Sequence, residues 1–157
     1  MLHFHLIFVG KTAFPEMDAG IGRYLDRLRH YVPTEVHLVR AEKISGCSAD
    51  DLVREREGER ILKLLEKPDH LLIWDQRGQQ LDSMGFARFW DRLNNEGTSK
   101  VWMVIGGPLG VSGKLLERAN SVFSLSKMTF PHDLARLIVV EQLYRAFSIL
   151  KGEPYHK

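Results

Sequence analysis

The fold is decided by the stretch Val101-Trp102-Met103-Val104-Ile105-Gly106-Gly107-Pro108-Leu109-Gly110. Its first half is a continuous apolar run, which is typical of a strand that is buried on both faces of a parallel sheet. Its second half is a glycine-rich turn at the point where such a strand gives way to a helix. Ligands bind at the carboxyl ends of strands in open α/β sheets. The stretch therefore predicts both a fold class and a place for a functional site.

The rest of the chain alternates between apolar segments of strand length and segments with helical spacing. Strands are expected over residues 2–9, 36–39, 71–74, 101–105 and 122–125. Helices are expected over 16–31, from a Ser48 cap to about 66, from a Ser83 cap past 93, and over 112–120 and 132–150. This alternation predicts an α/β protein with a mainly parallel sheet and helices on both faces. Because no linker divides the chain, we expect a single domain over residues 1–157.

The composition is that of an ordinary soluble protein, with 44% hydrophobic and 27% charged residues among 157. A net charge of +2 permits a polyanionic partner but does not require one. The lone cysteine, Cys47, excludes an internal disulfide and a thiolate zinc site and fits a reducing compartment. No run approaches the roughly 20 apolar residues of a membrane span, and the amino terminus reads as a strand. We therefore expect a cytoplasmic protein.

The glycine turn has two explanations. Gly106, Gly107 and Gly110 lack Cβ atoms, so the backbone there can approach a ligand closely. The pattern is neither a P-loop nor the dinucleotide-binding fingerprint. A plain strand-to-helix turn is the more common origin of such a pattern.

A second unusual loop, Leu125-Ser126-Lys127-Met128-Thr129-Phe130-Pro131-His132, follows the last expected strand. It combines the hydroxyls of Ser126 and Thr129 with the apolar side chains of Met128 and Phe130. This mixture suits a flat aromatic ligand that needs apolar walls and polar contacts. Alternatively, Met128 and Phe130 pack into the core.

The last helix carries a histidine at its start and is apolar nearly all round. His132 could act as a neutral base, although most helix-end histidines only bond to backbone. Helices without a polar face are buried on more than one side, either by a partner subunit or within the core of the same chain.

The chain ends in Tyr155-His156-Lys157. Tails of this kind are usually frayed. However, tyrosine can stack on a nucleic-acid base, histidine can move a proton and lysine can contact phosphate.

Taken together, these motifs resemble the ribosomal large subunit methyltransferase H family of the SPOUT superfamily. The resemblance covers the whole chain. It rests on Val104–Gly110, Leu125–His132, Glu141–Phe147 and Pro154–Lys157, with Val9-Gly10-Lys11 and Glu57-Gly58-Glu59 as further matches.

The resemblance implies a SPOUT-type α/β domain with a C-terminal trefoil knot, acting as a homodimer. It implies S-adenosylmethionine as methyl donor and N3 of a pseudouridine in 23S ribosomal RNA as acceptor, within the large subunit or the assembled ribosome, with no metal and no membrane. Trp74, where the family often has leucine, and Leu109, where it often has a more polar residue, depart from the family pattern. The implied cofactor-binding residues are Trp74, Gly106, Leu125, Ser126, Lys127, Met128, Thr129 and Phe130.

Methylation at N3 requires a base because this nitrogen carries a proton. We expect the base among His132, His156 and, less favoured, Asp75, with Tyr155 orienting the nucleotide. The residues expected to hold phosphate are Arg136, Arg145 and Lys157. Two alternatives remain. One is another nucleotide-binding α/β enzyme such as a small dehydrogenase, against which the missing N-terminal glycine fingerprint counts. The other is a non-enzymatic RNA-binding module.

Overall fold

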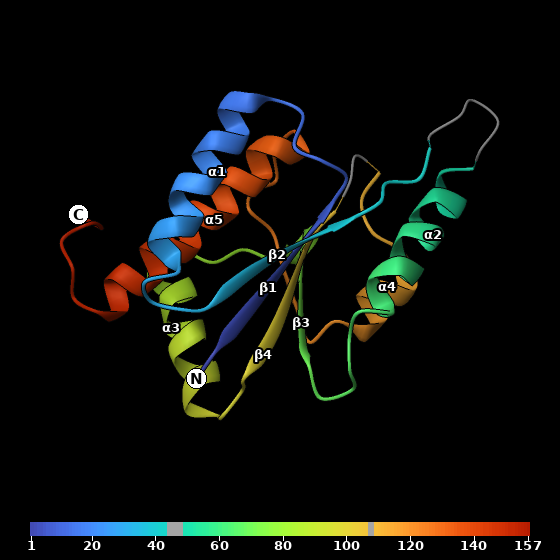
Figure 1. The fold of residues 1–157 in the computed structure, drawn as a ribbon. Coiled ribbons are helices and arrows are strands. Elements are labelled where there is room, and N and C mark those ends of the chain that lie inside the picture. Colours follow the sequence, from blue (N-terminus) through green and yellow to red (C-terminus); the bar gives the residue numbers. More distant parts are fainter. Residues whose placement is uncertain (44–48, 107–108) are drawn as a thin grey trace.

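The computed structural model describes residues 1–43, 49–106 and 109–157, and its strands and helices alternate along the chain (Figure 1). The strands are β1 (His3–Val9), β2 (Thr34–Val39), β3 (His70–Gln79), β4 (Lys100–Ile105) and β5 (Ser121–Phe123). The helices are α1 (Pro15–Leu28), α2 (Asp50–Leu62), α3 (Ser83–Asn95), α4 (Gly113–Arg118) and α5 (His132–Leu150).

The strands form one sheet in the order β2-β1-β4-β3-β5, and all neighbouring strands are parallel. The stretch that predicted the fold, β4, occupies the centre, where Met103 lies opposite Leu6 on one side and Leu72 on the other. Residues 101–105 are all buried. The predicted parallel α/β sheet is therefore confirmed.

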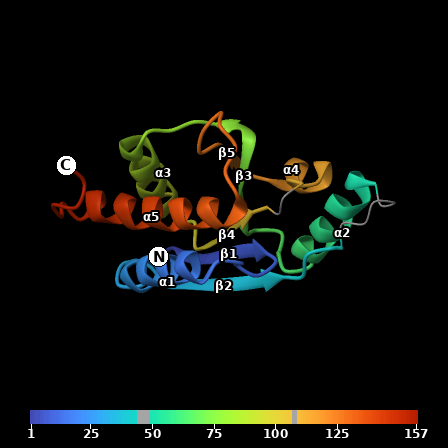
Figure 2. The same ribbon diagram turned by 90° about the horizontal axis from the view of Figure 1, so that it is seen from above.

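Helices cover both faces of the sheet, as predicted (Figures 1 and 2). Successive side chains of a strand point to opposite faces, so Phe4 and Leu6 pack with α1, α3 and α5. Ile7 and Val9 pack with α2 and α4 on the other face. The bounds of α5 are those predicted. Among the described residues, no helix is long and apolar enough to cross a bilayer.

The apolar character of α5 is explained largely by packing within the chain. Figure 2 shows α5 running between α1 and α3. The approach to α1 is close, since a Cβ added at Gly20 would lie 3.1 Å from Cδ1 of Leu137. Burial within the core of the same chain therefore accounts for much of the apolar character of α5.

Several predicted boundaries were wrong. Strand β3 does not end at Trp74 but continues to Gln79, which pairs with Phe123 beyond an irregularity in register. The polar composition of residues 75–78 had suggested a loop. Gly78 fits this place because an added Cβ would lie 2.5 Å from the backbone of Phe123.

Other differences concern the helices, since α1 ends at Leu28 rather than at Tyr31 and two caps differ. Asp82, not Ser83, is the N-cap of α3, and its carboxylate accepts a hydrogen bond from the Gly85 N–H. The Ser83 hydroxyl instead donates to Oε1 of Gln142 in α5. The N-cap of α2 is Ala49, while Ser48 lies outside the described residues, and this helix ends at Leu62 rather than near residue 66.

Candidate functional site

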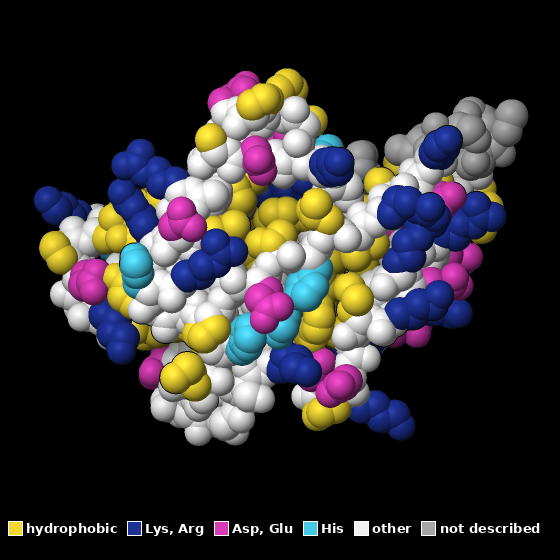
Figure 3. Space-filling model, viewed as in Figure 1, with side chains coloured by type: hydrophobic (Ala, Val, Ile, Leu, Met, Phe, Trp, Pro, Cys, Tyr) yellow, Lys and Arg dark blue, Asp and Glu magenta, His cyan; other side chains and the backbone are white. Residues whose placement is uncertain are grey.

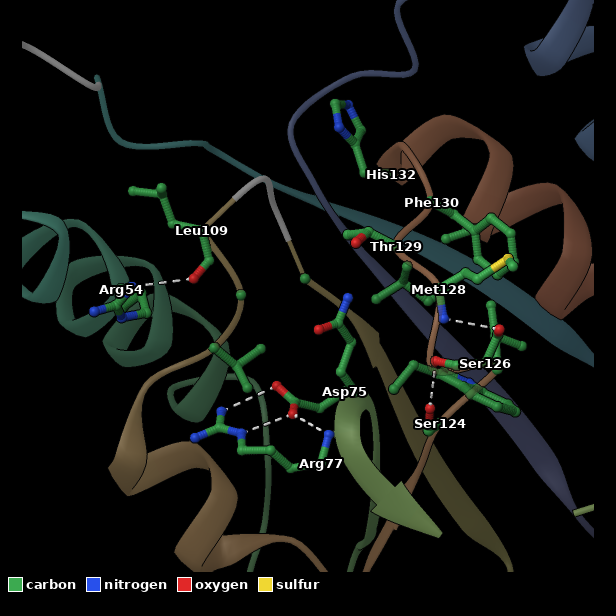
Figure 4. Close-up of a pocket in the computed structure, with 18 of the residues that line it drawn as sticks. Arg54, Asp75, Arg77, Leu109, Ser124, Ser126, Met128, Thr129, Phe130 and His132 are labelled. Carbon is green, nitrogen blue, oxygen red and sulfur yellow. Dashed lines mark hydrogen bonds and ion pairs between the residues drawn. The ribbon is translucent and has the colours of Figure 1, made fainter. Parts of the chain in front are cut away.

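A cavity of about 740 Å³ opens at the carboxyl ends of β3 and β4 (Figure 4). Its walls come from the end of β3, the loop between β4 and α4, and the loop between β5 and α5, with contributions from α2 and α5. The lining residues are Asp51, Arg54, Trp74, Asp75, Gln76, Arg77, Ile105, Gly106, Leu109, Gly110, Val111, Gly113, Ser124, Leu125, Ser126, Met128, Thr129, Phe130, His132 and Ala135.

One wall is the glycine turn. Gly107 and Pro108 lie outside the described residues, but Gly106 and Gly110 line the cavity. Gly110 has a φ of +81°, which favours glycine. A Cβ added at Gly106 would meet Cγ1 of Val111 at 3.0 Å. The turn is braced from α2, because Nη1 of Arg54 donates to the Leu109 carbonyl at 3.2 Å.

The opposite wall is the loop between β5 and α5, which is stabilised by hydrogen bonds within the loop. The Ser124 hydroxyl donates to the Ser126 carbonyl at 2.9 Å, and the Ser126 hydroxyl accepts from the Met128 N–H at 3.0 Å. Met128 is 76% exposed. The alternative in which Met128 fills the core is therefore wrong, and its apolar side chain is free to cover a ligand.

The floor includes Trp74 at β3. Its ring packs against Phe86 and Phe123, with centroids 5.5 and 5.9 Å apart. The buried Trp74 Nε1 has no hydrogen-bond partner among the described residues. Seven of the eight expected cofactor residues line this one cavity; the eighth, Lys127, is exposed and does not line it.

Sequence reasoning missed several lining residues. Arg77 binds the Asp75 carboxylate through Nε at 2.8 Å and Nη2 at 3.0 Å. This pairing lowers the pKa of Asp75, which makes Asp75 a weak base and argues against its expected secondary role. From α2, Asp51 and Arg54 form an ion pair at the cavity. Only the polar run after Trp74 signalled any of these residues, since nothing in the sequence of α2 indicates a contact with the glycine turn.

His132 lies at the start of α5 and lines the cavity. Its Nε2 is 3.3 Å from Oδ1 of Asp133. The Asp133 carboxylate is buried and accepts the N–H groups of Ala13 at 2.9 Å and Phe14 at 3.0 Å, just before α1. The histidine is thus next to a fixed acceptor.

Arg136 does not occupy a place where it can bind phosphate. Its side chain is fully buried, with Nη2 donating to the Val9 carbonyl at 2.7 Å and Nη1 to the Thr12 hydroxyl at 3.0 Å. The guanidinium also lies over the Phe8 ring. Burial lowers its pKa, and Asp133 opposes that shift. The expectation for Arg136 is corrected: the residue ties α5 to the end of β1.

The C-terminal tail is docked rather than frayed. The Tyr155 hydroxyl donates to Oε1 of Glu141 at 3.1 Å. Arg145 also bonds Glu141 through Nε at 3.0 Å, lies over the Tyr155 ring and contacts Nδ1 of His156 at 3.2 Å through Nη1. Burial raises the pKa of Tyr155. Lys157 is exposed.

The structure therefore separates the expected catalytic residues. His132 is at the first residue of α5 and the tail follows its last (Figure 1). Tyr155 docks on Glu141 and His156 on Arg145, which follow His132 by nine and thirteen residues, roughly 14 and 20 Å along the helix axis. One protomer brings His132, but not Tyr155 or His156, to the cavity.

A parallel sheet with a loop-walled cavity at the carboxyl ends of its strands defines an α/β protein with a small-molecule site. A family model described as "Predicted SPOUT methyltransferase" matches residues 2–156. Three relatives carry the name ribosomal RNA large subunit methyltransferase H. The chain belongs to the SPOUT methyltransferases and, within them, to the ribosomal RNA large subunit methyltransferase H family.

These relatives match nearly end to end. The relative from Syntrophobacter fumaroxidans is 59% identical over 99% of this chain and 100% of its own length. The relative from Christiangramia forsetii is 41% identical over 96% of both chains. The relative from Halothermothrix orenii is 41% identical over 98% of both chains.

Proposed function

We propose that this protein transfers the methyl group of S-adenosylmethionine to N3 of a pseudouridine in 23S ribosomal RNA, as a cytoplasmic homodimer acting on the large subunit or the assembled ribosome. The names of its relatives support large-subunit ribosomal RNA as the substrate. The observation that carries the proposal is the convergence of seven expected cofactor residues on one cavity.

The cavity has the size and lining that the cofactor needs. Its volume of about 740 Å³ lies within the range of small-molecule pockets. The close backbone approach at Gly106 provides a surface that a Cβ would disturb. Met128 and Phe130 supply apolar walls, and backbone groups of the two loops supply polar contacts. These features support adenosine binding between the loops.

The bound cofactor supplies an electrophilic methyl group, so the reaction calls for no metal. The protein has to hold the acceptor nitrogen in line with that methyl group, and such positioning supplies much of the rate enhancement. It also has to remove the N3 proton. His132 lines the cavity, and its Nε2 lies 3.3 Å from Oδ1 of Asp133. We assign His132 as the base.

The distance along α5 supports a shared site. Because the tail of one protomer docks beside Glu141 and Arg145, more than two helical turns from His132, and does not line the cavity, we place the tail of a second copy at the cavity of the first. Tyr155 and His156 of that copy then meet the nucleotide. Arg145 orders this tail, and Lys157 is left to contact phosphate.

The remaining family features extend the same proposal. We propose one domain over residues 1–157, because all strands join one sheet. The trefoil knot would involve the two loops that wall the cavity, and the position of both loops beside it supports this. A net charge of +2 is small for RNA binding, so recognition rests on the shape of the assembled particle as well as on phosphate contacts.

Mass spectrometry of 23S ribosomal RNA from a strain that lacks this protein tests the reaction and the nucleotide together. We expect one pseudouridine to lose a methyl group and to regain it when the wild-type gene, but not a His132→Ala variant, is restored. Unchanged methylation would favour the binding-module alternative. Titration of the purified protein with S-adenosylmethionine and with NAD separates a methyltransferase from a dehydrogenase.

A further inference from the structure

A cluster of histidines lies outside the cavity, on the sheet face that α2 and α4 cover only in part. His3 and His5 alternate along β1, and Glu35 and His37 alternate along β2. His5 is in register with Glu35, so all four side chains share one face. Figure 3 shows histidine side chains gathered around an acidic one there. Three of the chain's seven histidines meet at this place.

The distances within the cluster are those of groups that can share an ion. Nε2 of His3 is 2.9 Å from Oε1 of Glu35, and Nδ1 of His5 is 3.0 Å from Nε2 of His37. Oε2 of Glu35 is 4.0 Å from the His5 nitrogen and 3.9 Å from the His37 nitrogen. Ligand atoms of His3, His5 and Glu35 all lie within 4.8 Å of one another.

The cluster also holds an unused polar atom. His5 is only 8% exposed, and its buried Nε2 has no hydrogen-bond partner among the described residues. The His5 ring stacks on His3 at 4.5 Å and on Trp102 at 4.3 Å. This packing fixes the two imidazoles side by side, and an unpaired buried nitrogen is costly.

We propose that His3, His5, His37 and Glu35 bind one divalent transition-metal ion of the zinc type. Imidazole and carboxylate are ligands that Zn²⁺ accepts in tetrahedral sites. Adjacent ligand atoms in such a site lie roughly 3.3 Å apart, given metal–ligand distances near 2.0–2.1 Å. Glu35, the most exposed ligand, closes the site by a small side-chain rotation.

The surrounding charges permit this site. Lys100 is the cation that acts on His5, and its Nζ is 3.7 Å from Glu66 and 3.9 Å from Asp69. The charge of Lys100 is therefore partly compensated by the carboxylates of Glu66 and Asp69.

The ion would have a structural role. Strand β2 is at the edge of the sheet and pairs only with β1 in the described sheet, so a shared ion would tie this edge strand to its neighbour. The cluster lies toward the amino ends of the strands, whereas the methyltransferase cavity lies at their carboxyl ends. The site is thus separate from the reaction, which needs no metal.

Zinc binding to the untagged full-length protein tests the proposal. Zn²⁺ is titrated against a chromogenic chelator at neutral pH, for wild type, Glu35→Gln, His37→Gln and a His30→Gln control that lies outside the cluster. We expect one equivalent of Zn²⁺ per chain, at least about tenfold weaker binding in both cluster variants, and no change in the control. Equal affinity in wild type and Glu35→Gln, or an equal loss in His30→Gln, would overturn the site.

Two further measurements separate binding from misfolding. Glu35 and His37 are largely or partly exposed, so circular dichroism should show both variants folded. Zn²⁺ should raise the melting temperature of wild type more than that of Glu35→Gln, because an ion that binds only the folded chain stabilises it. Binding should also fall at acidic pH, because an imidazole has to be neutral to bind a metal ion. A melting temperature that Zn²⁺ leaves unchanged in wild type would contradict the structural role.

Discussion

Nε2 of His132 lies 3.3 Å from Oδ1 of Asp133, so the imidazole at the cavity is next to a buried carboxylate. The other oxygen of this carboxylate accepts the N–H groups of Ala13 and Phe14 just before α1. This pair connects the proposed base to the framework of the fold.

Replacing His132 with alanine should remove the base without removing the cofactor site. We expect kcat to fall by about 10²–10⁴-fold, the usual contribution of a positioned base. The dissociation constant for S-adenosylmethionine should stay within about twofold, since the loops supply most of the binding surface. Single-turnover methylation and calorimetric titration measure the two effects. His30→Ala serves as the control, and full turnover by His132→Ala would exclude His132 as the base.

Adding one methyl group at Gly106 should weaken cofactor binding. The new Cβ of Gly106→Ala would lie 3.0 Å from Cγ1 of Val111 and 3.4 Å from the carbonyl carbon of Gly110. Overpacking of this kind costs about 1–3 kcal/mol. Restoring the shape of the turn for the ligand at that cost would lower the affinity about 5- to 150-fold. Gly22→Ala is the control, because a Cβ there meets nothing within 4 Å. Equal cofactor affinity in both variants would show that the turn does not contact the ligand.

The sequence predicted the elements with local signals. The bounds of α5 and the inward face of α3 followed from apolar spacing, and Ser112 was correctly expected at the start of α4. The error at β3 arose because residues 75–78 are polar, yet they continue a strand beside β5. A strand that forms because it pairs with a segment distant in the sequence cannot be predicted from its own composition.

The predicted site was incomplete for the same reason. Of the seven expected cofactor residues at the cavity, Trp74 lies in β3 and six lie on loops that the sheet brings together, and the resemblance identified them. The burial of Arg136 could not be foreseen, because its partners Val9 and Thr12 are more than 120 residues away in the chain. An arginine on a helix near a proposed RNA site and an arginine that ties two elements together have the same local pattern.

Arg136→Met should therefore affect stability rather than RNA binding. The change leaves the Val9 carbonyl without its donor and Asp133 without its nearby cation. Removing one partner of a buried pair costs about 3–5 kcal/mol, so urea denaturation should give a free energy of unfolding lower by that amount. Lys157→Ala should leave the free energy of unfolding unchanged. Weaker RNA binding by Arg136→Met, with wild-type stability, would contradict the structural role.

Stability should fall in mild acid because of His70. Burial, followed by the charges of Arg118 and Arg92, lowers its pKa below the ordinary 6.5. Below about pH 6.5 the unfolded chain thus binds more protons than the folded one, and the free energy of unfolding decreases as the pH falls toward the folded pKa. His70→Gln should flatten this slope between about pH 7.5 and pH 5.5 in urea titrations with chelator present. Since His5 shifts in the same direction, part of the slope should remain; an unchanged slope would count against His70.

A mixing experiment tests whether the tail acts on the partner protomer. His132→Ala lacks the base, and a variant truncated after Glu153 lacks Tyr155 and His156, so each homodimer should be inactive. In a heterodimer of the two, the cavity of the truncated copy keeps His132 and receives the tail of the other copy. Random mixing gives half heterodimers with one intact site each, so activity should recover to about a quarter of wild type. A tail that served its own protomer would leave every site broken, and the mixture would stay inactive. Cofactor titration of the truncated variant provides the control, because a tail that meets only the nucleotide should not change the affinity for S-adenosylmethionine.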